Sequence, residues 1–205
     1  MIEALGSTED RLDNLSEQDM EKLLAGFPIS VQKTGKPLMA ALRERHAQRL
    51  SKLENLEASL GRGDLDRGKI VFFGRGACYT CHAVGREGAH FGPDLSNIGE
   101  IRSRHDILEA IVFPSASFAR EYDTYQVRTK TKSYLGVIRE QLRDAVILAV
   151  GPGAEVRVPK AEIISLGPHN ISMMPPGLEQ SLNHEELSDL MAYLMSLPDT
   201  YKTMN

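Results

Sequence analysis

The pattern of apolar and polar positions predicts a polar, helical segment at the start of the chain. Ser16 is expected to cap a first helix, which the Gly26-Phe27-Pro28 stretch ends. Pro37 suits the first turn of a second helix, in which leucines recur at three- and four-residue steps up to Leu60. Two glycines follow, so we predict an N-terminal helical segment or linker over residues 1–62.

Amphipathic patterns predict three further helices in residues 63–199, which we interpret as the main domain. Apolar residues face one side over 64–73 and 103–113, and a last helix opens at Asn183. In the middle helix Ser103 can act as N-cap, with Asp106 at the third helical position. The domain is therefore expected to be mainly α.

The sequence between the last two helices has a strand-like pattern instead of a helical one. Residues 122–129, 133–139, 145–150 and 155–158 alternate or run apolar, are rich in β-branched and aromatic residues, and are separated by turn signals. We predict a small antiparallel sheet of three or four strands, inserted at about 121–166. So small a sheet needs support, from the helices or from a second copy of the chain in a homodimer.

Composition argues against nucleic acid as a partner and against a transmembrane segment. With 41% hydrophobic and 25% charged residues and a net charge of −4, the chain is typical of a globular protein and unlike a nucleic-acid binder. No apolar run approaches the length of a transmembrane helix. The first thirty residues also lack the apolar centre of a signal peptide.

Both cysteines of the chain lie in Cys78-Tyr79-Thr80-Cys81-His82. C-x-x-C-H is the attachment signature of c-type haem, in which two thioethers anchor the porphyrin and the histidine binds iron. Two other interpretations are weaker. A redox C-x-x-C needs a βαβ context, whereas a glycine-containing turn precedes Cys78. A zinc site would need further ligands from histidines such as His90, His105 or His169.

A second axial ligand can come from the Met173-Met174-Pro175-Pro176-Gly177 loop. A thioether is a soft, neutral ligand, and His/Met coordination raises the reduction potential. We favour Met174, because Pro175 restricts its backbone most directly, and keep Met173 as the alternative. A second imidazole is the competing source, although His90 follows His82 closely and His105, His169 and His184 suit surface or capping positions.

From about Asp64 to Leu197 these motifs resemble the class I c-type cytochromes. The chain looks most like the haem-binding domain at the C-terminus of exported dehydrogenase-like proteins of planctomycetes and verrucomicrobia. The matching stretches are 68–72, Cys78 to His82, Gly92-Pro93-Asp94-Leu95, 174–178 and 187–197. The resemblance implies a cytochrome c-like fold with one covalent haem c. It further implies that the Pro93 carbonyl accepts from His82, and that Met174 is the distal ligand.

The expected function is electron transfer by a haem whose iron is held by His82 and Met174, with no catalytic residue of its own. The resemblance implies a redox donor and acceptor as partners, including a dehydrogenase that is either fused or associated. Because haem c is attached outside the cytoplasm, a periplasmic or otherwise exported location is expected. The missing export signal then suggests a mature product or a piece of a longer protein. The alternative is a peroxidase-like enzyme or a gas or redox sensor with an open sixth site.

Overall fold

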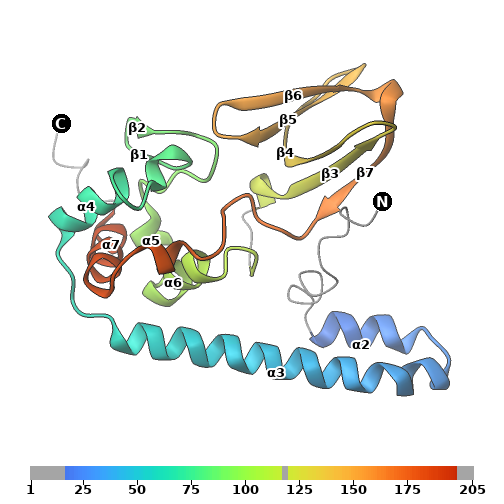
Figure 1. Cartoon of the computed structure of the whole chain (residues 1–205), viewed down its shortest axis with the longest axis horizontal. Coiled ribbons are helices and arrows are strands. Elements are labelled where there is room, and N and C mark those ends of the chain that lie inside the picture. Colours follow the sequence, from blue (N-terminus) through green and yellow to red (C-terminus); the bar gives the residue numbers. More distant parts are fainter. Residues whose placement is uncertain (1–16, 117–119, 198–205) are drawn as a thin grey trace. The chain divides into compact units, whose positions relative to one another are not determined.

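The computed structural model describes residues 17–116 and 120–197, and the chain divides between Ser59 and Leu60 into two compact units (Figure 1). Helix accounts for 49% and strand for 22% of the structure. The expectation of a mainly α chain is therefore only partly confirmed, because the sheet is larger than the sequence indicated. None of the helices in the described residues has the length and apolar character that crossing a membrane requires.

The first unit contains two helices, α2 (Glu17–Ala25) and α3 (Ile29–Ser59). Met20, Met39 and Leu42 are buried between them, with Leu24 and Leu38 packed alongside. The predicted start of the second helix near Pro37 was wrong. The helix begins eight residues earlier, where the Pro28 carbonyl accepts from the backbone N–H of Val31 and Gln32, so Pro37 lies inside it. The predicted cap, Ser16, lies outside the described residues.

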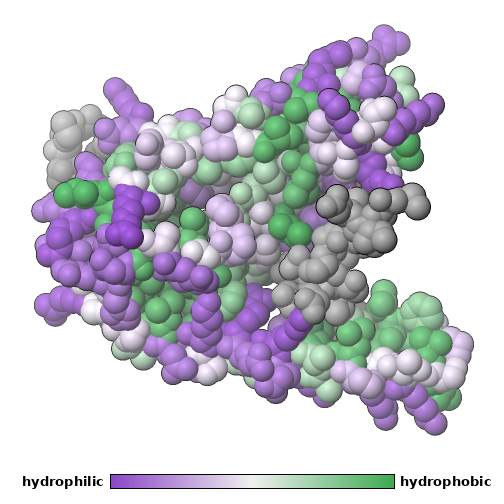
Figure 2. All heavy atoms as spheres, viewed as in Figure 1, coloured by the Kyte–Doolittle hydropathy of each residue, from purple (hydrophilic) through white to green (hydrophobic). Residues whose placement is uncertain are grey.

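A hydrophobic patch lies at the turn between α2 and α3 (Figure 2). Leu23, Phe27, Ile29 and Val31 are all exposed there, and Ile29 exposes 70% of its surface. Apolar side chains of the first unit are therefore buried where α2 and α3 pack together, and they are exposed at the connecting turn.

The second unit contains α4 (Leu65–Phe73), α5 (Ile98–Ile101), α6 (Arg104–Val112) and α7 (His184–Ser196). Side-chain caps from nearby residues begin three of these helices, α4, α6 and α7. Asp64 accepts from the N–H of Arg67 and caps α4. Ser103 with Asp106, and Asn183 with Glu186, form reciprocal capping boxes at α6 and α7. These caps satisfy backbone donors that the first helical turn would otherwise leave unpaired.

The helices α4 and α7 cross at close range, and this crossing is the core of the second unit. Phe72 is fully buried, and its ring centroid lies 5.7 Å from that of Tyr193 in an edge-to-face arrangement. Gly68 makes the approach possible, because a Cβ atom at this position would lie 2.0 Å from the backbone oxygen of Asp189. Any side chain at residue 68 would push the two helices apart.

A buried carboxylate on α7 also bonds to the start of α4. Asp189, 3% exposed, accepts from Arg67 Nε at 2.7 Å, Arg67 Nη2 at 3.0 Å and the Asp64 N–H at 2.6 Å. Arg67 also pairs with Glu185 at the surface. The hydrogen bonds from Arg67, in the first place, hold the pKa of Asp189 below its ordinary value of 3.8. The ionised form of Asp189 therefore stabilises the folded state.

This lowered pKa predicts a specific pH dependence of stability. A carboxyl whose folded pKa is lowered contributes stability above its unfolded pKa, and the contribution is lost as pH falls through the folded value. We expect Asp189→Asn to unfold at a lower temperature than wild type at neutral pH, and this difference to shrink below pH 3.8. Thermal unfolding followed by circular dichroism measures it. As a control, Glu155→Gln on the exposed surface of β6 should show neither effect, and a pH-independent difference for Asp189→Asn would contradict the prediction.

A five-stranded antiparallel sheet lies between α6 and α7 in the chain (Figure 1). Its spatial order is β6-β5-β4-β3-β7. The strands are β3 (Thr124–Thr129), β4 (Ser133–Gln141), β5 (Ala145–Gly151), β6 (Ala154–Pro159) and β7 (Ile163–His169). The four predicted strands correspond to β3 to β6. The fifth was missed, because β7 is a largely exposed edge strand that contains Gly167 and Pro168.

The sheet has an apolar core of its own. Val127, Val146, Leu148 and Val158 are each at most 2% exposed, and they come from the three strands β3, β5 and β6. Tyr134 and Ile138 are among the partly buried side chains that pack against them. A second, minimal ladder joins β1 (Ala83–Val84) to β2 (Glu87–Gly88), directly after the histidine of the C-x-x-C-H motif.

Candidate functional site: a haem attachment turn

The C-x-x-C-H motif forms one tight helical turn after α4. The helix ends at Phe73, and the N–H groups of Gly74 and Gly76 both return to the Val71 carbonyl. Ala77 then adopts φ 49°, a left-handed conformation that opens the 3₁₀ turn η1 (Cys78–Thr80). The N–H groups of Cys81 and His82 donate to the Cys78 carbonyl at 3.1 and 2.9 Å. This turn brings both thiols and the imidazole together.

His82 is held in one orientation by the loop that follows. Its Nδ1 lies 2.7 Å from the carbonyl oxygen of Pro93. Because a carbonyl can only accept, Nδ1 carries the proton in the neutral ring and Nε2 keeps its lone pair. Burial lowers the pKa of His82, and the hydrogen bond to Pro93 opposes this in part. The ring is thus neutral, oriented and able to bind a metal through Nε2.

Further hydrogen bonds tie this loop to the motif. The N–H of Gly92 donates to the Cys81 carbonyl at 2.7 Å, and that of Leu95 donates to the Ala83 carbonyl at 2.9 Å. Gly92 also leaves room for the imidazole, since a Cβ atom there would lie 2.7 Å from Cε1 of His82. The loop therefore fits around the ring as well as bonding to it.

The two cysteines are half-buried and free, so no disulfide joins them. Burial raises the pKa of Cys78 to about 11, which keeps its thiol protonated at neutral pH. A redox pair needs the opposite, a stabilised thiolate, and the motif follows a helix where a thioredoxin-type site follows a strand. Among the residues that the structure describes, no group of three or more His, Cys, Asp or Glu side chains could hold a metal ion. The zinc hypothesis therefore finds no support.

The methionines come from a separate loop, between β7 and the 3₁₀ turn η4 (Leu178–Ser181). Met173 and Met174 are both half-buried. The N–H of Met174 donates to Ser172 Oγ at 3.1 Å, and the N–H of Ser172 donates to Ser115 Oγ at 3.0 Å. The start of the loop is thus anchored, and the sequence carried no signal for these serine contacts.

The competing histidines lie in different parts of the second unit. His90 is exposed in the loop after β2, and His184 is the exposed first residue of α7. His105 and His169 are half-buried, in α6 and at the end of β7. The structure thus gathers Cys78, Cys81, His82 and Pro93 at one site.

Comparison with known proteins bears on this site directly. The family model for cytochrome c matches residues 65–147, from the start of α4 into β5. The match includes the attachment turn, His82 and Pro93, and it ends before the methionine loop. No curated protein matches the chain. The match supports a haem-binding, electron-transfer domain of the cytochrome c type in the second unit.

The cofactor of such a domain is covalently bound haem c, and the residues at the site fit it. Two thiols lie one helical turn apart, next to an imidazole whose Nε2 is free to bind iron. Nitrogen from histidine and sulfur from cysteine thioethers are the groups that hold haem c in proteins. Cys78 and Cys81 would anchor the porphyrin, and His82 would bind the iron.

Proposed function

We propose that this chain is a single-haem electron-transfer cytochrome in which His82 and Met174 occupy both axial positions of the iron. When bound, haem c supplies an iron that takes up and releases one electron. The task of the protein is then to hold the metal in one coordination, exclude water and leave an edge for electron exchange. With both axial positions filled, no site is open for a substrate.

The observation that carries this proposal is the hydrogen bond from His82 Nδ1 to the Pro93 carbonyl at 2.7 Å. It orients the ring and raises the basicity of Nε2, as outer partners of metal-bound histidines do. A mobile or charged imidazole could do neither. His82 is thus suited to remain bound in both oxidation states, which a fast electron carrier requires.

Met174 is the proposed distal ligand because its backbone is restrained on both sides. Pro175 restricts the conformation of the residue before it. On the other side, the Met174 N–H is bonded to Ser172. A restrained sulfur loses little entropy on binding iron. Met173 remains the alternative ligand, and the resemblance to class I cytochromes favours Met174.

The proposed partners are a redox donor and an acceptor, with a dehydrogenase, fused or associated, as the donor. We further propose the narrower relationship to the C-terminal haem domains of exported dehydrogenase-like proteins of planctomycetes and verrucomicrobia. An exported, periplasmic location follows from the chemistry of haem attachment, since cytochrome c domains are typically exported. A homodimer through the sheet is the remaining proposal on partners.

Replacing each methionine separately tests the ligand assignment. Met174→Leu is expected to abolish the weak long-wavelength absorption band of methionine-bound ferric haem and to lower the reduction potential, because the soft thioether that favours Fe(II) is lost. Leucine has a similar volume, so the loop should keep its packing. Met173→Leu is the matched control and should retain both the band and the potential.

The opposite pair of results would assign the ligand to Met173. A wild-type protein without the band, whose reduced form binds carbon monoxide rapidly, would contradict the electron carrier and favour the peroxidase-like or sensor alternative. A band that survives both substitutions would contradict ligation by either methionine.

A further inference from the structure

One end of the five-stranded sheet meets both loops of the proposed haem site. Thr124 opens β3 and pairs with Val137 of β4 on one side and with His169 of β7 on the other. Arg139 lies two residues beyond Val137 in β4. We call Thr124, Arg139 and His169 the loop-binding end of the sheet. These residues lie on three hydrogen-bonded strands, so their relative positions are fixed by the sheet.

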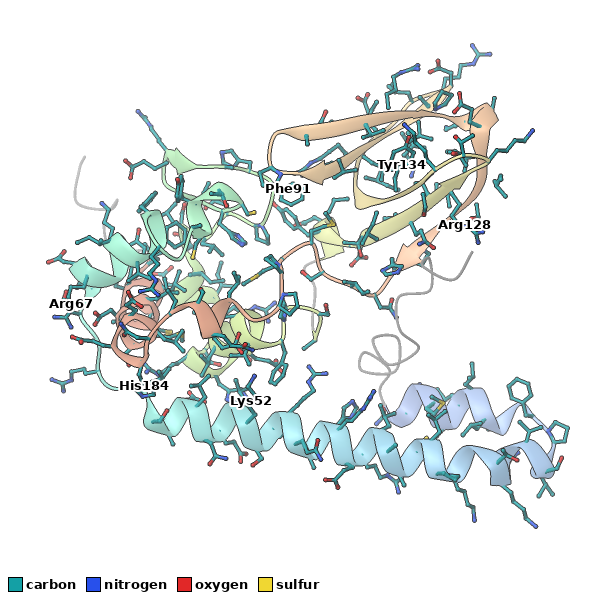
Figure 3. The ribbon with its side chains drawn as sticks, viewed as in Figure 1. Lys52, Arg67, Phe91, Arg128, Tyr134 and His184 are labelled. Atoms are coloured by element: carbon teal, nitrogen blue, oxygen red, sulfur yellow. The ribbon has the colours of Figure 1, made fainter. Side chains whose placement is uncertain are left out.

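Arg139 connects this end to the proximal loop. Its Nη2 donates to the carbonyl oxygens of His90 at 2.8 Å and Phe91 at 3.1 Å. Phe91 is buried, and Figure 3 shows it where the loop after the attachment motif meets the sheet. Both carbonyls directly precede Gly92 and Pro93. The guanidinium group thus holds the segment that presents the Pro93 carbonyl to His82.

A β-bulge directs Arg139 toward this loop. In the pairing of β4 with β5, Ile138 lies opposite Leu148 and Glu140 opposite Ile147, so Arg139 is the extra residue. Bulges of this kind redirect a side chain and occur often beside functional sites. The sheet is therefore irregular at the residue that contacts the proximal loop.

Thr124 connects the same end to the methionine loop. Its side chain is 1% exposed, and Oγ1 lies 2.6 Å from the carbonyl oxygen of His169 and 2.8 Å from that of Ile171. The single hydroxyl proton is shared between these two acceptors. Ile171 directly precedes Ser172, whose Oγ accepts from the N–H of Met174. The hydroxyl thus fixes the segment from which the methionine loop starts.

We propose that the loop-binding end of the sheet sets the two ligand loops relative to each other, with Arg139 and Thr124 as positioning residues for His82 and Met174. The inference rests on the proposed function, because it concerns both proposed axial ligands. Neighbouring strands joined by backbone hydrogen bonds make a stiff connection. Loss of either contact should therefore change the iron environment on one side only.

The proximal half is tested by Arg139→Gln in the haem-loaded protein. Without the guanidinium the loop is released, the His82–Pro93 hydrogen bond weakens and the imidazole becomes less basic. We expect a higher reduction potential, together with faster hydrogen exchange at the N–H groups of Gly92 and Leu95. Arg128→Gln is the matched control, since Arg128 is exposed on β3 of the same sheet (Figure 3). Arg139→Lys keeps one donor group and should show a smaller change in the same direction.

The distal half is tested by Thr124→Val, which keeps the shape of the side chain and removes the hydroxyl. Release of the methionine loop should let an added ligand such as imidazole displace the sulfur more easily. We expect the apparent affinity of ferric protein for imidazole to rise roughly tenfold, as expected for loss of one buried hydrogen bond. Thr124→Ser retains the hydroxyl and should restore the wild-type affinity, whereas the potential change of Arg139→Gln should not appear in either variant.

The outcomes separate this inference from the function on which it rests. A wild-type protein without methionine ligation contradicts the proposed function before any sheet variant is made. Wild-type ligation combined with Arg139→Gln and Thr124→Val proteins that behave like Arg128→Gln overturns the inference alone. If Arg139→Gln does not fold, Arg139→Lys decides the proximal half, and an unchanged potential and exchange rate in that variant count against it.

Discussion

A Cys78→Ala/Cys81→Ala double variant is expected to lose all covalently bound haem. Each thioether needs one cysteine sulfur, and Cys78 and Cys81 are the only cysteines of the chain. Each single variant retains one anchor and should keep the haem under denaturing conditions. Intact mass measured in denaturant should therefore show one haem in wild type and in each single variant, and none in the double variant.

A matched control lies within the motif itself. Tyr79→Phe should keep the haem, because the ring of Tyr79, centred 6.0 Å from that of Phe73, remains in place. His82 can still hold a porphyrin without covalent attachment, so the measurement must be made on unfolded protein. A double variant that carries haem mass in denaturant would contradict the attachment site. So would an exported wild-type protein whose two thiols both react with an alkylating reagent.

Gly68→Ala is expected to destabilise the second unit by about 3 kcal/mol, the upper part of the range for overpacked cores. A Cβ atom at residue 68 would meet the backbone oxygen of Asp189 at 2.0 Å and Cβ of Tyr193 at 2.7 Å. A backbone group in a helix cannot turn aside as a flexible side chain can. The helices α4 and α7 must then separate, which would lower Tm by roughly 6–12 °C.

Helix propensity by itself would make Gly68→Ala stabilising, which is opposite to the expected result. Alanine is favoured over glycine inside a helix by about 1 kcal/mol, so any loss must come from the contact with α7. Gly167→Ala is the control, because a Cβ atom there would meet nothing within 4 Å. Thermal unfolding of the three proteins decides the matter. A Gly68→Ala protein as stable as wild type would mean that α4 and α7 do not cross as closely as described.

Much of the local structure could be predicted because it depends on residues close together in the chain. The capping pair Ser103 and Asp106 and the cap residue Asn183 begin α6 and α7 as expected. Strands β3 to β6 follow β-branched and aromatic runs between clear turns. Pro37 shows the limit of such rules, since proline suits the first turn of a helix and yet lies inside α3.

In the candidate site, too, the features that depend on neighbouring residues could be predicted, and those that depend on long-range contacts could not. The attachment turn is defined by five consecutive residues, so its spacing alone indicated haem. The contact of Arg139 with the His90 and Phe91 carbonyls joins residues 49 and 48 positions apart, and no local pattern marks it. The bulge at Arg139 could not be predicted from local patterns either, since it depends on the pairing of β4 with β5.

By itself the sequence determined the haem motif, most element starts and the presence of an inserted sheet, because each depends on short-range spacing and on intrinsic preferences. Only the tertiary structure decided the close helix crossing at Gly68 and the buried Asp189 carboxylate bonded to Arg67, 122 residues away. The same holds for the loop-binding end of the sheet, where Thr124 and Arg139 make their contacts. These features depend on which distant surfaces meet. Their energies come from packing and from hydrogen bonds that form only when the whole unit is folded.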